Sequence, residues 1–298
     1  MDAAVGLVAA TVLSAAAGAL VSGRLLARVR RVTEAARAAT DSNLGQRLNL
    51  PGPEDEIKEL GDTFDTMLAR LDEGLAVQRR FLANASHELR TPLAVTRTAV
   101  EVTLAKPDAT VAQLRAMGGE VGAAMGRAQR LVDSLLVLAR SEQGLAVREP
   151  DDLADIAGEA VDHLRPQATA NGVQVRVELA AAPVVGDLAL LSRAVANLVE
   201  NAIRYDREGG EVVVATGADG LRSWVRVTNT GPDMSTVDLD RLFEAFQRGE
   251  RTRLDSDGAG LGLSIVAAVA RAHDGSVDAR ARDRGAGGGL SVTLSLPL

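Results

Sequence analysis

Residues 81–93 read FLANASHELRTPL, and this stretch decides the fold of the middle of the chain. Apolar side chains recur at three- and four-residue spacing from residue 73 to residue 106, which predicts one long amphipathic helix. His87 lies off the apolar stripe of that helix, so we expect its imidazole to project into solvent. An exposed, neutral imidazole can act as a nucleophile.

The residues next to His87 limit the reactions in which its imidazole can take part. Glu88 is adjacent and can orient the ring or take its proton. Pro92 removes a backbone donor and predicts a kink close to His87. A metalloprotease site of the H-E-x-x-H type is excluded, because position 91 is Thr and the second zinc ligand is missing.

A second helix follows the histidine helix. A turn is predicted at residues 107–108, with Asp108 or Thr110 as the N-cap of a helix whose apolar stripe runs from Val111 to Leu138. Two antiparallel helices alone bury too little surface to be stable. We therefore expect a homodimer in which two such hairpins form a four-helix bundle.

The N-terminal residues predict a membrane anchor. Residues 3–23 carry no charge and are long enough to cross a hydrocarbon core of about 30 Å. The arginines that follow this run place its C-terminal side in the cytoplasm: Arg24, Arg28, Arg30 and Arg31. A cleaved signal peptide is the alternative, and it is disfavoured because only Met1 and Asp2 precede the run.

Residues 25–77 predict two short helices around a connector. Pro-Gly-Pro at residues 51–53 cannot continue a helix, and the acids at 54–56 suit the start of the next one. This pattern resembles a HAMP relay, a parallel helical bundle that follows membrane helices in receptors. The first helix lacks the usual Pro of that family, and a plain coiled-coil linker is the alternative.

From residue 144 onward, helix and strand patterns alternate. This pattern predicts an α+β domain with helices on one face of a mixed sheet. The predicted helices are 153–170, 188–204 and 261–273, and the predicted strands are 173–179, 211–216, 223–228, 275–280 and 290–296.

The candidate nucleotide site combines glycines and asparagines. Neither a P-loop sequence nor a Rossmann fingerprint occurs, but the glycine cluster at 258–262 opens a predicted helix, whose free N–H groups suit a phosphate. Asn197 and Asn201 are one helical turn apart, and an amide oxygen is a reasonable magnesium ligand beside phosphates.

Taken together, these motifs resemble the sensor histidine kinases of bacterial two-component systems, over residues 25–298. The resemblance implies that His87 accepts the γ-phosphoryl group of ATP and that Glu88 assists as base. It also implies that Thr91 serves the reverse reaction, in which water attacks the phospho-aspartate of a response regulator. The C-terminal domain then has the ATP-binding fold of the GHKL (Bergerat) group, as an α+β sandwich.

The same resemblance assigns the nucleotide site. It implies that Asn201 holds Mg²⁺ and that Phe243 and Phe246 anchor a lid carrying Arg248 and Arg251. Asn229 stands where the family has an Asp that accepts a hydrogen bond from the adenine amino group. Its carbonyl can still accept although the charge is lost, so ATP binding is expected to persist with a weaker affinity. The remaining residues implied to line the site are Asn197, Arg204, Tyr205, Gly231, Gly258, Gly260, Leu261, Gly262 and Leu263.

Composition excludes several other classes. A net charge of −7 argues against a nucleic-acid binder, and the absence of Cys excludes disulfides, Cys-based zinc sites and thiol nucleophiles. Two alternatives remain open. A GHKL-type ATPase has a Glu at the position of Asn197, and a non-catalytic scaffold of the same fold needs no intact His87. His163 and His273 lack such a context and are interpreted as structural.

The sequence thus predicts a multidomain, single-pass protein of the inner (plasma) membrane with a cytoplasmic catalytic part. The expected parts are an anchor at 1–24, a HAMP-like relay at 25–77, a dimerisation and phosphotransfer hairpin at 78–143 and an ATP-binding domain at 144–298. The expected partner is the receiver domain of a response regulator, with no nucleic acid. Whether His87 is phosphorylated within one subunit or across the dimer stays open.

Overall fold

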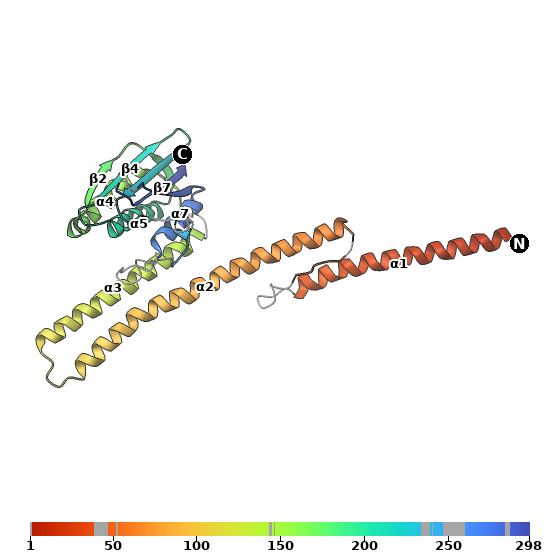
Figure 1. Ribbon diagram of the computed structural model, residues 1–298, viewed down its shortest axis with the longest axis horizontal. Helices are drawn as coiled ribbons and strands as arrows, with labels where there is room; N and C mark the ends of the chain where they lie inside the picture. The colour runs from red at the N-terminus through yellow and green to blue at the C-terminus, as the bar shows by residue number, and fades with distance from the viewer. Residues whose placement is uncertain are drawn as a thin grey trace. The chain divides into compact units, whose positions relative to one another are not determined.

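The computed structural model describes residues 2–38, 47–51, 53–142, 145, 147–233, 239, 241–246, 260–283 and 287–298. The chain forms two compact units, Met1–Ala83 and Asn84–Leu298. Helices make up the first unit, and the second adds a mixed α/β domain to helical segments (Figure 1).

The N-terminal half contains longer helices than the sequence pattern predicts. Helix α1 spans Asp2–Ala38 and helix α2 spans Glu56–Leu104. Two helices flank a connector within residues 25–77, as predicted, but neither is short: the first continues the N-terminal segment, and the second continues into the histidine helix. No Pro or Gly pair interrupts the chain at either junction, so nothing ends the helix there. Helix α2 also runs through Pro92.

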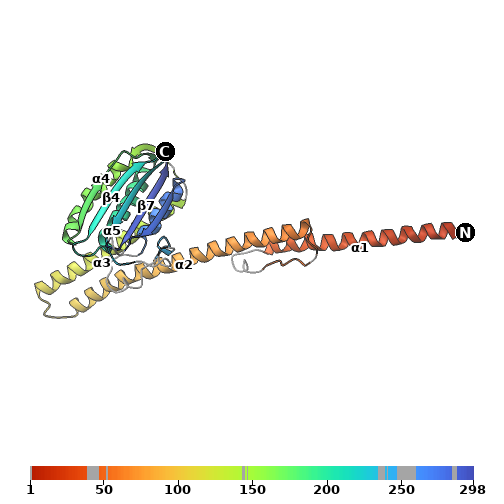
Figure 2. The ribbon, with the colours of Figure 1, turned by 45° about the horizontal axis from the view of Figure 1, so that its top comes forward.

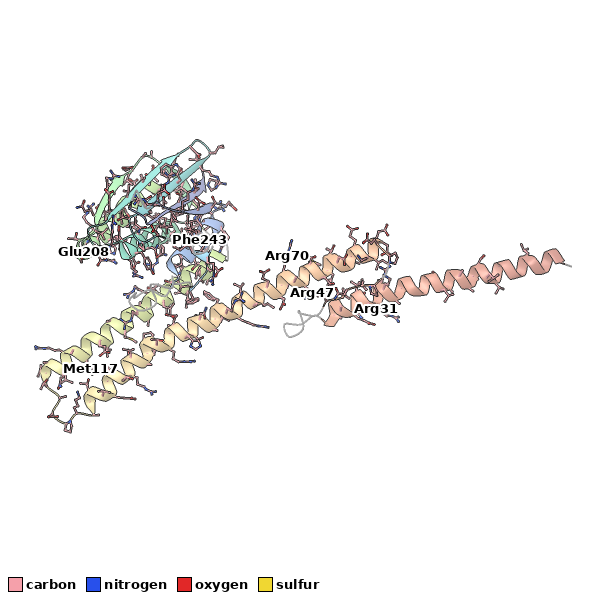
Figure 3. The ribbon with its side chains drawn as sticks, in the orientation of Figure 1. Arg31, Arg47, Arg70, Met117, Glu208 and Phe243 are labelled. Carbon is pink, nitrogen blue, oxygen red and sulfur yellow. The ribbon has the colours of Figure 1, made fainter. Side chains whose placement is uncertain are left out.

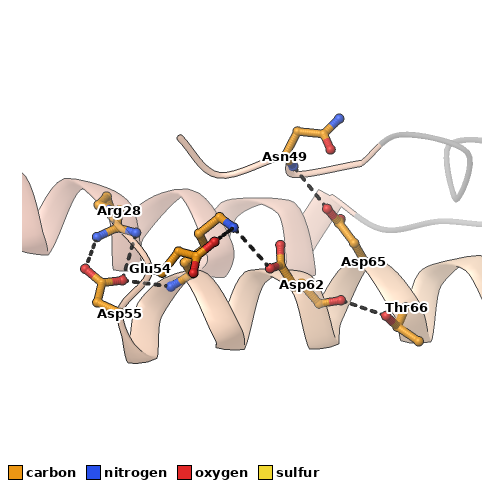
Figure 4. A network of polar contacts seen from close by, with 8 residues as sticks. Arg28, Asn49, Glu54, Asp55, Asp62, Asp65 and Thr66 are labelled. Atoms are coloured by element: carbon orange, nitrogen blue, oxygen red, sulfur yellow. Dashed lines mark hydrogen bonds and ion pairs between the residues drawn. The ribbon is translucent and has the colours of Figure 1, made fainter. Parts of the chain in front are cut away.

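In the first unit, the connector is held against α2 by a set of polar contacts (Figure 4). The Asp65 carboxylate accepts the backbone N–H groups of Leu48 (2.7 Å) and Asn49 (3.0 Å). Leu50 is buried on Gly61, where an added Cβ would lie 2.6 Å from the Leu50 Cδ1 atom. Residue 61 must therefore lack a side chain for the connector to pack this closely.

An ion pair joins α1 to the start of α2 in the same unit. The Arg28 guanidinium donates to both carboxylate oxygens of Asp55, with Nη2 2.9 Å from Oδ1. The hydrogen bonds from Arg28 hold the pKa of Asp55 below its ordinary value, and the backbone N–H of Lys58 adds to this effect. Asp55 thus also caps the first turn of α2.

Among the described residues, the structure contains no helix that combines the length and the apolar character needed to cross a membrane.

Helices α2 and α3 (Val111–Glu142) form an antiparallel hairpin, visible in Figures 1 and 2. Thr110 caps α3 as predicted: its hydroxyl accepts the N–H of Gln113, whose side chain accepts the N–H of Thr110. Large apolar side chains are exposed along both helices: Leu82, Leu93, Val102, Leu104, Val111, Leu114, Met125, Val132 and Leu136.

The C-terminal domain is built on a five-stranded sheet of order β2-β4-β5-β7-β6. Only the β2–β4 pair is parallel, so the sheet is mixed, as predicted. Its strands are β2 (Gln174–Glu178), β4 (Glu211–Ala218), β5 (Arg222–Asn229), β6 (Ser276–Ala281) and β7 (Leu290–Pro297). A separate antiparallel pair, β1 (Glu149–Asp152) with β3 (Pro183–Gly186), was not predicted.

Three helices cover one face of this sheet: α4 (Leu153–Ala170), α5 (Leu188–Tyr205) and α7 (Gly262–Ala272), as Figure 2 shows. The layer between them and the strands is aliphatic, because apolar residues alternate along β4, β5 and β7. Fully buried members include Leu153, Leu191, Leu198, Ile203, Ile265, Val214 and Leu294. The predicted arrangement of helices on one sheet face is confirmed.

His273 joins two of these helices. Its side chain is 2% exposed, Nδ1 lies 2.8 Å from the carbonyl of Val269, and Nε2 accepts the N–H of Asp187 at 3.0 Å. The ring therefore connects the end of α7 to the N-cap of α5, which agrees with a structural role. Desolvation lowers the pKa of His273, Arg148 lowers it further, and Val269, Asp187 and Asp274 oppose the shift.

This burial predicts a pH-dependent stability of the C-terminal domain. Because the folded pKa is lowered, the unfolded chain binds the proton more tightly. The contribution of His273 to the free energy of unfolding is therefore fully present above the unfolded pKa of about 6.5. It falls as pH drops through that value, by at most about 1.4 kcal/mol per pH unit. His273→Gln is expected to remove this slope.

Urea unfolding at several pH values checks the prediction, followed by the fluorescence of Trp224, the chain's single tryptophan, which lies in β5. His163→Gln is the matched control, because His163 is exposed on α4. An unchanged slope in His273→Gln contradicts the prediction.

Candidate functional site

Helix α5 carries the two asparagines that the sequence singled out. Apolar residues on one face of α5 pack on the sheet, and Asp187 caps the helix by accepting the N–H of Leu190 at 3.1 Å. Asn197 is 6% exposed and its Nδ2 has no hydrogen-bond partner among the described residues. A buried amide without a partner is costly, which suits a group that a ligand completes.

The first turn of α7 lies next to these asparagines. Its N-cap, Leu261, makes no side-chain capping bond, so the N–H groups of the first turn depend on other acceptors. Gly260 has a φ of +69°, a conformation that favours glycine and turns the chain into the helix. Helix N-termini of this kind bind phosphate readily.

An open pocket of about 660 Å³, solvent at its mouth included, lies between α3, α5 and the start of α7. Seven predicted residues line it: Asn197, Asn201, Arg204, Tyr205, Gly260, Leu261 and Gly262. The charged side chains of its wall are Arg127, Arg130, Arg193, Arg204 and Glu200, with Arg204 and Glu200 paired at 2.7 Å. This excess of arginine favours a polyanionic ligand.

The predicted lid is described only at its ends. The N–H of Phe246 donates to the carbonyl of Gly260 at 2.9 Å, so the two ends lie together. Phe243, labelled in Figure 3, is partly buried and does not line the pocket. Leu263 is also buried outside the pocket wall. Arg248, Arg251 and Gly258 lie outside the described residues.

The end of β5 forms a second part of the candidate site. Asn229 is 5% exposed, and its Nδ2 donates to the carbonyl of Thr230. Gly231 is close to the end of α5, because an added Cβ there would lie 3.0 Å from the Tyr205 carbonyl oxygen. Neither Asn229 nor Gly231 lines the pocket described above.

His87 is exposed on α2, as the pattern predicted. The hydroxyl of Thr91 donates to the His87 carbonyl at 3.3 Å, one helical turn earlier. His87, Glu88 and Thr91 are not among the residues that line the pocket. The structure therefore does not bring the phosphoacceptor candidate and the nucleotide site candidate together.

Three family models match successive parts of the chain. A HAMP domain matches residues 20–73, a His Kinase A (phospho-acceptor) domain matches 77–144, and a histidine kinase-, DNA gyrase B-, and HSP90-like ATPase matches 186–298. The chain belongs to the sensor histidine kinase family. In this family of kinases, the ATPase match supports ATP use by the C-terminal domain.

Individual kinases agree with this assignment. Sensor protein CutS of Streptomyces coelicolor is 46% identical over 83% of this chain and 59% of its own length. Sensor protein CopS of Pseudomonas syringae pv. tomato is 34% identical over 83% of this chain and 51% of its own. The chain thus spans little more than half the length of these curated relatives. The match to full-length ShkA, solved in complex with AMPPNP, covers 73% of this chain and 45% of the ShkA chain, with 25% identity and a TM-score of 0.53.

The sequence motifs of the kinase family miss several residues at the site. Arg127 and Arg130 come from α3, where helical periodicity carries no sign of a ligand. Arg193 lies one turn before Asn197, and the sequence alone gives no reason to distinguish it from a surface cation. Asp206 follows Tyr205 directly, and its contacts with Thr230 depend on folding. Spacing along α5 was the one signal available for Arg193 and Glu200.

Proposed function

We propose that the chain is a protein-histidine kinase that transfers the γ-phosphoryl group of Mg-ATP to His87, and from there to an aspartate of a response regulator. The observation that carries the proposal is the arginine-rich pocket at the N-terminus of α7, beside Asn197 and Asn201. ShkA, which is 25% identical to this chain, was solved in complex with AMPPNP. A triphosphate fits the charge of this pocket.

Within the pocket, the roles follow from chemistry and from the family motifs. The N–H groups that follow Leu261 and Gly262 bind phosphate oxygens. Arg204 and Tyr205 line the nucleotide, and Asn229 with Gly231 binds the base. Phe243 and Phe246 anchor the lid, with Arg248 acting on the γ-phosphate, and the remaining proposed site residues are Asn197, Gly258, Gly260 and Leu263.

Asn201 is proposed as the protein ligand of the magnesium ion. The described residues contain no cluster of three or more His, Asp or Glu side chains that would hold a metal by itself. Magnesium at a nucleotide is held by one or two protein oxygens, phosphates and water, so a single amide ligand is compatible with it. The partly buried side chain of Asn201 on the pocket wall satisfies this requirement.

Phosphoryl transfer then proceeds in line. A ring nitrogen of His87 bonds to the γ-phosphorus while the bond from that phosphorus to the β–γ bridging oxygen breaks, which releases ADP. Glu88 accepts the ring proton. Because His87 does not line the pocket, either the ATP-binding domain moves along the helices or the His87 of a second copy enters.

The helical segments are proposed to dimerise. Exposed apolar residues run along both helices of the hairpin, and burying them in a four-helix bundle contributes roughly 25 cal/mol per Å². We further propose that residues 1–24 anchor the chain in the plasma membrane, with 25–77 as the relay, 78–143 as the phosphotransfer hairpin and 144–298 as the cytoplasmic catalytic domain. The HAMP match and the uncharged run at 3–23 support this.

The proposal is tested by incubating the purified chain with γ-labelled ATP and Mg²⁺. The expected label is labile in acid and stable in base, as a phosphoramidate is. A GHKL-type ATPase would release free phosphate and leave the protein unlabelled, and a scaffold would do neither. Asn197 favours transfer over hydrolysis, because an amide cannot take a proton from water.

Thr91→Ala is expected to leave labelling of His87 within about twofold and to slow dephosphorylation of the response regulator roughly tenfold or more. The reason is that the Thr91 hydroxyl, exposed one turn after His87, can orient the attacking water. Release of phosphate from a phosphorylated receiver domain measures the effect. Equal rates for parent and variant contradict the assignment, and Thr98→Ala, exposed further along α2, is the matched control.

A further inference from the structure

Asp206 is a partly buried carboxylate that no motif assigns. It follows the last residue of α5 in an extended conformation, and its Oδ1 accepts the N–H of Arg207 at 2.8 Å and the hydroxyl of Thr230. Its Oδ2 is buried and has no hydrogen-bond partner among the described residues. Desolvation raises the pKa of Asp206. A carboxylate kept there at such a cost needs a reason.

The hydroxyl of Thr230 can point in only one direction. It accepts the N–H of Glu211 at 3.0 Å, so its single proton is donated to Asp206. The pair fits because residue 210 is Gly: an added Cβ would lie 2.0 Å from Asp206 Oδ1 and 2.6 Å from Thr230 Oγ1. Asp206, Thr230 and Gly210 thus form one closely packed arrangement.

This arrangement fixes Asn229, the neighbour of Thr230. The Asn229 Nδ2 donates to the Thr230 carbonyl, and the reverse orientation would place two oxygens together. The Asn229 Oδ1 has no donor among the described residues and remains an acceptor. The exocyclic amino group of adenine is a donor that matches it.

We propose that base recognition is shared between two residues, with Asn229 as the acceptor for the adenine amino group and Asp206 as the residue that positions it through Thr230. This inference rests on the proposed binding of ATP in this domain. It is also compatible with the departure from the family pattern, because an amide at the strand end keeps an acceptor for the amino group and also donates to the Thr230 carbonyl, which a carboxylate cannot do.

A carboxylate at position 229 is incompatible with this arrangement. One of its oxygens would take the place of Nδ2 against the Thr230 carbonyl, where it cannot donate. It would also add a negative charge on the residue next to Thr230, whose hydroxyl donates to Asp206, and neighbouring carboxylates resist joint ionisation. Restoring the family's Asp is therefore harmful in this chain, and a neutral residue 206 removes only the charge repulsion, so it recovers only part of the loss.

The test compares affinities of the full chain for ATP and for purine riboside triphosphate, which lacks the amino group. Asn229→Asp is expected to weaken ATP binding about tenfold, and Asn229→Asp with Asp206→Asn to return it to within about threefold of the parent. Thr230→Val is expected to weaken ATP about tenfold while changing the affinity for the analogue less than about twofold. Glu208→Gln, an exposed carboxylate two residues beyond Asp206 (Figure 3), is the matched control.

Titration calorimetry separates the outcomes. A parent that binds ATP while Asn229→Asp binds it as well or better overturns the shared recognition and leaves the proposed function intact. If Thr230→Val loses equal affinity for ATP and for the analogue, Thr230 has only a structural role, and this result also overturns the shared recognition. A parent that binds neither nucleotide overturns both proposals.

Discussion

His87→Gln is expected to abolish phosphorylation of the chain by γ-labelled ATP, while ATP affinity stays within about twofold of the parent. The exposed imidazole is the only ring nitrogen nucleophile in the 81–93 stretch, and Gln offers an amide that does not attack phosphorus. The nucleotide pocket does not include His87, so its binding capacity is independent of the change.

His163→Gln is the matched control for that loss. His163 is also exposed, but it lies on α4, outside both the pocket and the helical hairpin. The His163→Gln variant is expected to be labelled like the parent. If His87→Gln retains full acid-labile label, another residue is the acceptor and the assignment of the phosphotransfer helix is wrong.

Asn201→Ala is expected to lower the rate of labelling by roughly 10²–10³-fold, a range typical for loss of one electrostatic group at a reacting centre. Asn201 is one helical turn after Asn197 and lines the pocket beside the N-terminus of α7. Without its amide oxygen, the metal ion that neutralises the phosphates loses its proposed protein ligand. The loss should be larger in rate than in nucleotide affinity.

Labelling rates over a range of magnesium concentrations measure this effect. Raised magnesium should restore part of the activity of Asn201→Ala, since the site is weakened and not blocked. Gln174→Ala removes an exposed amide from the edge strand β2 of the same domain and should behave as the parent. Unchanged labelling kinetics in Asn201→Ala would contradict the assignment of Asn201 as a metal ligand.

Much of the C-terminal domain was predictable from local pattern. The α4 helix, the hairpin of β4 and β5, and strand β7 follow hydrophobic periodicity that the sheet preserves on folding. The β1–β3 pair was missed because each strand has only four residues, and both contain Pro, which is typical of turns and edges. Short pairings depend on tertiary contacts, which periodicity does not report.

The site was predictable only in part, for a similar reason. Asn197 and Asn201 belong to one motif and the glycines to another, and the fold brings residues of both motifs to one pocket. Arg127 and Arg130 come from a helix with no motif of its own. Asp206 meets Thr230 across 24 positions of sequence, a separation at which spacing carries no information. The lengths of α1 and α2 were underestimated because the sequence was divided near residues 24 and 77, where no Pro or Gly pair ends a helix.

The central claim is that a nitrogen of His87 receives the γ-phosphoryl group from ATP held in the pocket. The most direct measurement is peptide mass spectrometry of the full chain after incubation with Mg-ATP, under alkaline conditions that preserve phosphohistidine. We expect a single phosphate on the peptide containing residues 81–93, located on the His87 ring and lost on acid treatment. Phosphate on a hydroxyl of that peptide, or ATP consumed to free phosphate with His87 unmodified, would contradict the claim.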